Sequence, residues 1–325
     1  MSMRKLKVVL AGKYPDHTFE TLSKLLPADK FDLVEVNTPE AYDAMTDAEI
    51  MILRIFKAPK EVIERNKNLK MILRWGAGFD SVDIETAGAR GVLVTNTPGA
   101  NAGAVSELAV LLMLAVGRRL MCHEDSLRRG EWSKNTFINC SYTLNNKVVG
   151  IVGAGNIGRQ VARKVQAFGA ATQYYDPYRL KPEMEEEFKL KFTSLDEVLK
   201  TSDLITLHVP LTDENKHMIN AERIAGMKDG AIIINTARGG LIDDHALAEA
   251  VKSGKLAGAG LDGVENEPLQ PGDELLTTPN IIVTPHVGGG TADIGDVIMP
   301  MLAQDIIDFA DGKEVKHVVN KQYLK

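Results

Sequence analysis

The stretch Val148-Val-Gly-Ile-Val-Gly153-Ala-Gly155-Asn-Ile-Gly158 decides the fold of the second half of the chain. Its first five residues are almost all apolar, which is typical of a strand buried on both faces of a sheet. Glycines follow the strand directly, and apolar side chains then recur at helical spacing from Ile157 to Phe168. The stretch therefore predicts a parallel strand, a tight turn and a helix.

Each glycine of this turn has a physical role. Gly153 permits the tight turn, Gly155 lets the backbone approach a pyrophosphate, and Gly158 lets the helix pack closely on the strand. The free N–H groups and the positive dipole end at a helix N-terminus favour phosphate. Asp176 ends the next predicted strand, 18 residues beyond Gly158. A carboxylate there hydrogen-bonds a ribose 2′-hydroxyl and repels a 2′-phosphate, so the stretch predicts an NAD site.

Strands alternate with helices on both sides of this stretch. The other predicted strands are Lys7–Ala11, Asp32–Val36, Met51–Ile55, Lys70–Arg74, Val92–Thr95, Thr172–Asp176, Leu204–Val209, Ala231–Asn235, Leu256–Leu261 and Ile281–Thr284. The other predicted helices are Thr18–Leu26, Pro59–Asn66, Asp83–Arg90, Asn101–Gly117, Cys122–Arg129, Ser194–Thr201, Ala221–Met227, Asp244–Ser253 and Thr291–Asp311. This alternation predicts an α/β protein with two open parallel-sheet domains. We expect a first domain of residues 1–100 plus 288–325 and a second of residues 101–287.

Composition limits the possible partners and compartments. The net charge of −6 argues against a nucleic-acid partner. The two cysteines, Cys122 and Cys140, have no CxxC spacing, so neither a disulfide framework nor a zinc site is expected. No histidine pair has metal-binding spacing, and we expect no metal. Leu108–Val116, the longest apolar run, is too short to span a bilayer, and the N-terminus does not read as a signal peptide. We therefore expect a cytoplasmic protein that does not bind a membrane.

Further motifs occur in a fixed order along almost the whole chain. They are Gly76-Ala-Gly-Phe-Asp80, Asn96-Thr-Pro98, His208-Val-Pro-Leu211, Asn235-Thr-Ala-Arg-Gly-Gly240, Leu261-Asp-Gly-Val-Glu-Asn-Glu-Pro268 and Thr284-Pro-His-Val-Gly288. With the glycine turn, they resemble the D-isomer-specific 2-hydroxyacid dehydrogenase family. The resemblance implies a flavodoxin-like substrate domain, a Rossmann domain that binds NAD, and hydride transfer between nicotinamide and a 2-hydroxy or 2-oxo acid.

By this resemblance the catalytic residues are Arg238, Glu267 and His286. A guanidinium grips a carboxylate and polarises a carbonyl. An imidazole passes a proton in either direction near neutral pH, and a neighbouring carboxylate orients the ring. Glu265 lies two residues before Glu267, but the residue directly before Pro268 fits the family pattern better.

The resemblance also assigns binding roles. The backbone of Ala77 and Gly78 is expected to hold the substrate carboxylate, since amides in such a turn donate hydrogen bonds to anions. The residues expected to bind the cofactor are Gly153, Gly155, Asn156, Ile157, Gly158, Asp176, His208, Val209, Pro210, Thr236, Asp262 and Gly288. Asn156 stands where many relatives carry arginine, and Gly263-Val264 stands where many carry Val-Phe.

Two arginines guide the choice of substrate. Arg54 and Arg74 end two predicted strands of the first domain, where ligands of open α/β sheets bind. Both positions resemble the phosphate side of D-3-phosphoglycerate dehydrogenases, so we expect 3-phosphoglycerate and 3-phosphohydroxypyruvate as substrates, without a C-terminal regulatory domain. The aromatic neighbours Phe56 and Trp75 leave open an apolar pocket for a larger 2-oxo acid.

Two alternatives of function and one of assembly stay open. The first is a glyoxylate/hydroxypyruvate reductase or a general D-2-hydroxyacid dehydrogenase, which shares the cofactor and the three catalytic residues. The second is an NADH-sensing interaction protein, because a fold alone does not fix a function. The family resemblance further implies a homodimer, and residues 101–117 with the segment through Trp132 are candidates for its interface. The apolar run Leu108–Val116 is equally suited to fill the monomer core.

Overall fold

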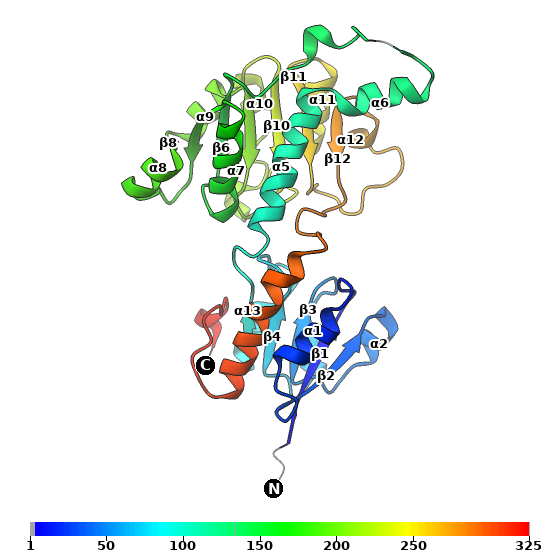
Figure 1. Ribbon diagram of the computed structural model, residues 1–325, viewed down its shortest axis with the longest axis vertical. Coiled ribbons are helices and arrows are strands. Elements are labelled where there is room, and N and C mark those ends of the chain that lie inside the picture. Colours follow the sequence, from blue (N-terminus) through cyan, green and yellow to red (C-terminus); the bar gives the residue numbers. More distant parts are fainter. Residues whose placement is uncertain (1–3, 133, 325) are drawn as a thin grey trace. The chain divides into compact units, whose positions relative to one another are not determined.

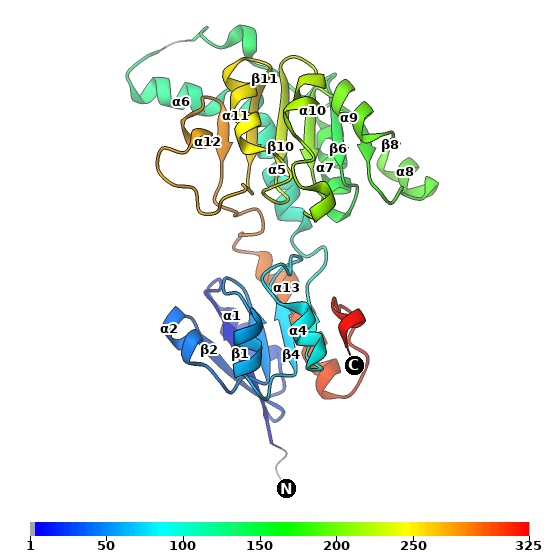
Figure 2. The same cartoon turned by 180° about the vertical axis from the view of Figure 1, so that it is seen from behind.

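The computed structural model describes residues 4–132 and 134–324, and the chain divides into two compact units (Figure 1 and Figure 2). Unit 1 contains Met1–Asn101 and Gly290–Lys325, and unit 2 contains Ala102–Gly289. Each unit is built on one parallel sheet. The expected fold class, α/β with two open parallel sheets, is confirmed.

Unit 1 has the strand order β2-β1-β3-β4-β5, which is the flavodoxin-like order. The strands are β1 (Leu6–Ala11), β2 (Phe31–Val36), β3 (Ile50–Leu53), β4 (Met71–Arg74) and β5 (Leu93–Thr95). The helices are α1 (Thr18–Leu25), α2 (Pro39–Ala44), α3 (Lys60–Arg65), α4 (Ile84–Ala89) and α13 (Ile294–Ala310). Alternate strand residues bury opposite faces of the sheet: Val8 packs with α1 and α13, and Val9 packs with α2, α3 and α4.

The last residues of the chain pack onto unit 1. Val318 forms an antiparallel bridge with Thr95 of β5, and the short helix η3 (Lys321–Tyr323) follows. Asn320 is fully buried there. Its Oδ1 accepts from Val94 N at 2.9 Å, and its Nδ2 donates to Val92 O at 2.9 Å. The side chain of Asn320 thus forms hydrogen bonds with two backbone groups at the edge of the sheet, where no neighbouring strand of the sheet pairs with them.

Unit 2 has the strand order β12-β11-β10-β9-β6-β7-β8. The strands are β6 (Val148–Val152), β7 (Ala171–Tyr175), β8 (Lys191–Phe192), β9 (Leu204–Leu207), β10 (Ala231–Asn235), β11 (Leu256–Leu261) and β12 (Ile281–Val283). The helices are α5 (Ala102–Gly117), α6 (Leu120–Arg128), α7 (Asn156–Ala167), α8 (Pro182–Phe188), α9 (Leu195–Thr201), α10 (Ala221–Gly226), α11 (Asp244–Lys252) and α12 (Glu274–Thr277), with the short η1 (Ile138–Cys140) and η2 (Asp213–Asn215).

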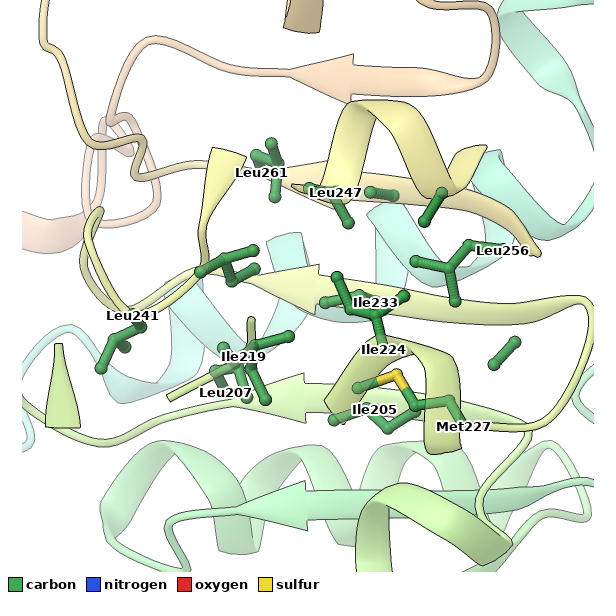
Figure 3. Packing of buried hydrophobic residues seen from close by; sticks show 14 of the residues in the cluster. Ile205, Leu207, Ile219, Ile224, Met227, Ile233, Leu241, Leu247, Leu256 and Leu261 are labelled. Atoms are coloured by element: carbon green, nitrogen blue, oxygen red, sulfur yellow. The ribbon is translucent and has the colours of Figure 1, made fainter. Parts of the chain in front are cut away.

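Helices cover both faces of the unit 2 sheet. Apolar residues of α5 and α7 pack on one face, and those of α9, α10 and α11 pack on the other. Figure 3 shows the second layer, in which Ile224 and Met227 lie beside Ile205 and Ile233 of the sheet, and Leu247 lies beside Leu261. With about 25 cal/mol for each Å² of apolar surface removed from water, such layers dominate the stability of the unit.

The strand order reverses between β6 and β9. These two strands pair in parallel, with Val152 opposite Leu207, and His208 N donates to Val152 O at 2.7 Å. The connections after the two strands run to opposite faces of the sheet, so their loops diverge beyond the carboxyl ends. This reversal places the glycine turn after β6 beside the residues that follow β9.

The boundaries of several elements differ from those predicted. β3 ends at Leu53 and β9 at Leu207, two residues earlier than expected, because the chain leaves the sheet at these carboxyl ends although the next residues are partly apolar. α2 and α8 were missed. Both begin with proline, and Thr38 Oγ1 caps α2 by accepting from Ala41 N at 3.2 Å. The sequence Thr38-Pro39-Glu40 is a helix start signal, but hydrophobic periodicity does not detect it.

No helix within 4–132 and 134–324 has the length and apolar character needed to cross a bilayer. In the same part of the chain, no cluster of three or more His, Cys, Asp or Glu side chains is placed to hold a metal ion.

We predict that Asn320→Ala lowers the free energy of unfolding of unit 1 by roughly 2–4 kcal/mol, because Val94 N–H and Val92 C=O lose their buried partner. Urea unfolding followed by tryptophan fluorescence measures the loss. A Trp132→Phe background leaves Trp75, which is buried in unit 1, as the reporter. Lys321→Ala is the matched control from the same segment, with an expected change below about 0.5 kcal/mol. Equal stability of the two variants would contradict the assigned role of Asn320.

Candidate active site

The turn between β6 and α7 requires glycine at two positions. Gly153 has φ 96, and a Cβ there would lie 2.7 Å from the backbone of His208. A Cβ on Gly158 would lie 2.1 Å from Gly153 O. The close contact of helix, turn and neighbouring loop therefore excludes any side chain. Gly155 differs, since its missing Cβ would meet no atom within 4 Å, and its backbone faces open space.

A cavity of about 1360 Å³ opens beside this turn. Gly155, Asp176, His208, Val209 and Pro210 line it. The N-terminus of α7, with its free N–H groups, begins directly after Gly155. An open glycine backbone, a helix N-terminus and a carboxylate on the wall are the donor and acceptor set that a dinucleotide requires, so the residues fit this cofactor.

Asp176 fixes the glycine turn as well as lining the cavity. Its Oδ2 accepts from Ala154 N at 2.8 Å, and its Oδ1 accepts from Tyr178 N at 2.8 Å. The carboxylate therefore connects the end of β7 to the middle of the turn. Each oxygen retains a second lone pair for an external hydroxyl group.

Two polar atoms of this region are buried without a hydrogen-bond partner among the described residues. They are Nδ1 of His208 and Oγ1 of Thr236. The other ring nitrogen of His208 lies 2.9 Å from Thr206 Oγ1. Burial lowers the pKa of His208 to about 3, so the ring is neutral near pH 7. Because buried polar atoms in proteins are nearly always paired, these two atoms mark positions where a ligand can bond.

Three loops at the same carboxyl edge of the sheet carry Arg238, Glu267 and His286. They follow β10, β11 and β12, whose carboxyl ends are adjacent because these strands pair in parallel. The structure brings Glu267 and His286 into direct contact. His286 Nδ1 lies 3.1 Å from both Oε1 and Oε2 of Glu267. Both side chains are about half exposed, at 48% and 43%. With Nδ1 bonded to the carboxylate, Nε2 is the ring atom available to an external group.

Arg238 lies on the loop that touches the Glu267 loop. A Cβ on Gly239 would lie 1.8 Å from Val264 O, so glycine is required for the two loops to pack together. Arg238 Nη1 donates to Ala237 O at 2.8 Å, and the Arg238 carbonyl accepts from Asn235 Nδ2 at 2.8 Å. This close approach also accounts for Gly263, whose missing Cβ would lie 3.0 Å from Gly239 N.

Asp262 holds the loop that carries His286. It is only 3% exposed. Its Oδ1 accepts from Thr284 Oγ1 at 2.6 Å and from Val287 N at 2.8 Å, and its Oδ2 accepts from Gly288 N at 2.8 Å. The carboxylate therefore binds Thr284 before His286, and Val287 and Gly288 after it. His286 itself has φ 53. Asp262 and Gly288, two residues expected along the cofactor, are bonded to each other here.

All four residues expected to bind the substrate lie in unit 1: Arg54, Arg74, Ala77 and Gly78. Arg74 donates from Nε to Gly78 O at 3.1 Å, and from Nη1 to Leu53 O and Arg54 O, each at 3.0 Å. The guanidinium thus ties together the carboxyl ends of β3 and β4. Arg54 Nη1 donates to Lys13 O, and Asn96 Nδ2 donates to Ala77 O at 2.7 Å.

The two aromatic neighbours of these arginines are packed inside unit 1. Trp75 is buried among residues of α13 and makes an edge contact with Tyr14 at 5.0 Å between ring centroids. Phe56 stacks on Tyr42 at 4.5 Å. These contacts pack both rings against the core of unit 1.

Sequence reasoning missed the surroundings of Glu265. This carboxylate does not replace Glu267 beside His286. It contacts His217 and Lys216, and its backbone N–H donates to Asp244. These partners lie far apart along the chain, and no spacing in the sequence pairs them.

Comparison with known proteins places this geometry in a family. Residues 110–288 match the family described as D-isomer specific 2-hydroxyacid dehydrogenase, NAD binding domain. A glyoxylate reductase of Thermococcus litoralis is 41% identical over 273 residues, which cover 82% of this chain and 82% of the relative. A hydroxypyruvate reductase of Thermotoga maritima is 44% identical over 259 residues, covering 78% and 82%. A D-3-phosphoglycerate dehydrogenase of Methanocaldococcus jannaschii is 41% identical over 283 residues, covering 86% of this chain but 53% of the relative.

Solved structures agree with this result. The holo form of D-mandelate dehydrogenase from Rhodotorula graminis superposes with a TM-score of 0.87 at 30% identity, covering 98% of this chain and 99% of that one. A glyoxylate reductase from Paecilomyes thermophila gives a TM-score of 0.85 at 31% identity, covering 98% and 100%. The chain therefore belongs to the D-isomer specific 2-hydroxyacid dehydrogenase family and is an NAD-dependent oxidoreductase.

Proposed function

We propose that this enzyme reduces a small 2-oxo acid of the glyoxylate/hydroxypyruvate class with NADH. The observation that carries the proposal is the contact of His286 Nδ1 with the Glu267 carboxylate at 3.1 Å, which leaves Nε2 for the substrate. Glu267 accepts a hydrogen bond from Nδ1–H and so fixes the tautomer and the orientation of the ring. His286 then donates a proton from Nε2 to the carbonyl oxygen of the 2-oxo acid, and accepts it back in the reverse direction.

Arg238 has a separate role in this proposal. Its planar guanidinium polarises the carbonyl and binds the carboxylate of the substrate. When bound, the nicotinamide cofactor supplies the hydride that reaches the carbonyl carbon. In unit 1, the backbone N–H groups of Ala77 and Gly78 are proposed to donate to the substrate carboxylate.

The cofactor contacts proposed for unit 2 follow the cavity beside the glycine turn. Asp176 accepts from the ribose hydroxyls, and the amides after Gly155 bind the pyrophosphate. The neutral ring of His208 and the hydroxyl of Thr236 bond the cofactor with atoms that have no partner among the described residues. The other residues proposed to contact the cofactor are Gly153, Asn156, Ile157, Gly158, Val209, Pro210, Asp262 and Gly288.

The choice of substrate class rests on Arg74. Its guanidinium makes three hydrogen bonds to backbone carbonyls, which supports a structural role at the ends of β3 and β4. A pair of arginines that clamps a phosphate is therefore less well supported than a site for an unphosphorylated acid. The glyoxylate and hydroxypyruvate reductases among the relatives support the same class.

A second candidate substrate is 3-phosphohydroxypyruvate. Arg54 favours it, because this partly exposed side chain follows β3 at the carboxyl edge of the sheet, where it can pair with a phosphate. The D-3-phosphoglycerate dehydrogenase among the relatives also supports this candidate, although the chain spans about half of that protein.

We further propose that the enzyme is a cytoplasmic homodimer. The helix α6 projects from unit 2 in Figure 1. Along it and the segment that follows, Leu120, Met121, Leu127, Trp132 and Ile138 are large apolar residues exposed to solvent. A monomer seldom exposes so many together unless a partner covers them.

Sedimentation velocity should give a dimer for the wild type and a monomer for Leu120→Asp/Leu127→Asp; a monomeric wild type would contradict the proposal.

We predict that His286→Gln lowers kcat roughly 10²- to 10⁴-fold, because glutamine cannot exchange a proton with the carbonyl oxygen. NADH binding, measured by fluorescence titration, should change little. His245→Gln is the matched control, since His245 also pairs with a carboxylate, Glu274, at 2.9 Å but lies outside the site. A His286→Gln enzyme with wild-type turnover would contradict the proposed role of the imidazole.

A substrate panel with Arg54→Met tests the substrate class. With NADH, we predict turnover of glyoxylate and hydroxypyruvate, and less than about a threefold change in kcat/KM for these acids in Arg54→Met. Loss of a charge-assisted bond of about 1.5–3 kcal/mol would lower kcat/KM for a phosphorylated substrate roughly 10- to 100-fold. A wild-type preference for 3-phosphohydroxypyruvate that Arg54→Met abolishes would replace the first proposal by the second.

A further inference from the structure

The loop after β11 carries a second glutamate with contacts of its own. Glu265 Oε2 lies 2.9 Å from His217 Nε2, and Glu265 Oε1 lies 3.1 Å from Lys216 Nζ. The backbone N–H of Glu265 donates to Asp244 Oδ2 at 2.9 Å. The side chain is 29% exposed. One residue is therefore bonded to two other segments, the one after η2 and the first turn of α11.

Those segments are themselves fixed to the loop that carries Arg238. His217 N donates to Gly240 O at 2.7 Å, and Ile219 N donates to Leu241 O at 3.0 Å. His217 has φ 50, a left-handed conformation that this pairing maintains. Asp243, the residue before Asp244, caps α11 by accepting from Ala246 N at 3.0 Å. The groups that bind Glu265 thus belong to a well-connected part of unit 2.

The backbone of Val264 connects Glu265 to the side chain of Glu267. Val264, the preceding residue, donates from its backbone N–H to Glu267 Oε1 at 3.4 Å. The carbonyl of Val264 is packed against Gly239. Glu265 therefore anchors the backbone segment that presents the Glu267 carboxylate to His286.

The groups that bind Glu265 stabilise its ionised form. Hydrogen bonds from His217 and then Lys216 hold the pKa of Glu265 below its ordinary value, so it is ionised near pH 7. Burial raises the pKa of Asp244 to about 6, and Asp244 faces the acidic groups of Glu265, Asp273 and Asp243. The ammonium group of Lys216, 3.1 Å from Glu265 Oε1, offsets part of this concentration of negative charge.

We propose that Glu265 is a positioning residue: by binding Lys216, His217 and Asp244, it holds the loop in the conformation in which Glu267 contacts Nδ1 of His286. The inference rests on the proposed roles of Glu267 and His286. It adds a residue that contacts neither the ring nor, on this proposal, the substrate. A displacement of about 1 Å at such a catalytic contact lowers turnover roughly 100-fold, so the effect is measurable.

The first test needs no activity. Hydrogen–deuterium exchange of the peptide covering residues 262–268 should be faster in Glu265→Ala than in the wild type, and intermediate in Glu265→Gln, which keeps an acceptor for Lys216. Glu274→Ala is the matched control, because it breaks the pair with His245 at 2.9 Å on the neighbouring helix α12. Unchanged exchange in Glu265→Ala would overturn the inference even if no 2-oxo acid is turned over.

The second test is a double-mutant cycle in kcat, with the 2-oxo acid that the wild type reduces fastest. We expect Glu265→Ala to lower kcat about 10- to 100-fold, with NADH affinity within about twofold of the wild type. In a Glu267→Gln background, the same change should have little further effect, because both substitutions act through one contact. Effects that multiply fully would show that Glu265 acts independently of Glu267. Failure of the wild type on every 2-oxo acid would instead refute the proposed function.

Discussion

One buried amide holds together the two loops that carry Arg238 and Glu267. Asn235 ends β10 and is 1% exposed. Its Nδ2 donates to Arg238 O at 2.8 Å and to Gly263 O at 3.3 Å, and its Oδ1 accepts from Ala237 N at 3.1 Å. Its own carbonyl accepts from Asp262 N at 2.8 Å. Asp262 then holds the loop around His286, so a continuous set of hydrogen bonds connects all three strand ends. Low dielectric strengthens such a network, and its loss leaves several buried groups unsatisfied.

The regular parts of the fold were predictable because their causes are local. Val148–Val152, Ala231–Asn235 and Leu256–Leu261 have the bounds expected from sequence, since each is a continuous apolar run with a polar or glycine boundary. The glycine turn was equally readable, because Gly153 and Gly158 meet backbone atoms that no side chain can approach. The predictions failed for short elements such as α2 and α8, which have six and seven residues and are too short to show a helical periodicity.

The site was predictable only in part, because its contacts join loops that are distant in sequence. The family resemblance predicted Glu267 and His286 as partners, and their side chains are in contact. No feature of the sequence indicates that Arg74 donates to three backbone carbonyls, because an arginine at a strand end can bind a ligand or the neighbouring backbone equally well. The same holds for Glu265 and Lys216, whose pairing depends on how the loop after β9 is folded.

The loop after β11 shows how surroundings separate two chemically similar pairs. Both Glu265 and Glu267 bind an imidazole at about hydrogen-bond distance, at 2.9 Å and 3.1 Å. Glu265 also binds the ammonium group of Lys216, which favours its ionised form, and its backbone N–H donates to Asp244, which fixes its position. Glu267 faces a ring that is half exposed, with one nitrogen held and the other open to exchange. A proton donor must be both oriented and accessible, and the half-exposed ring of His286, held at Nδ1, satisfies both conditions. In the proposed mechanism the first pair orients the second, so the two glutamates, which are two residues apart, have different roles.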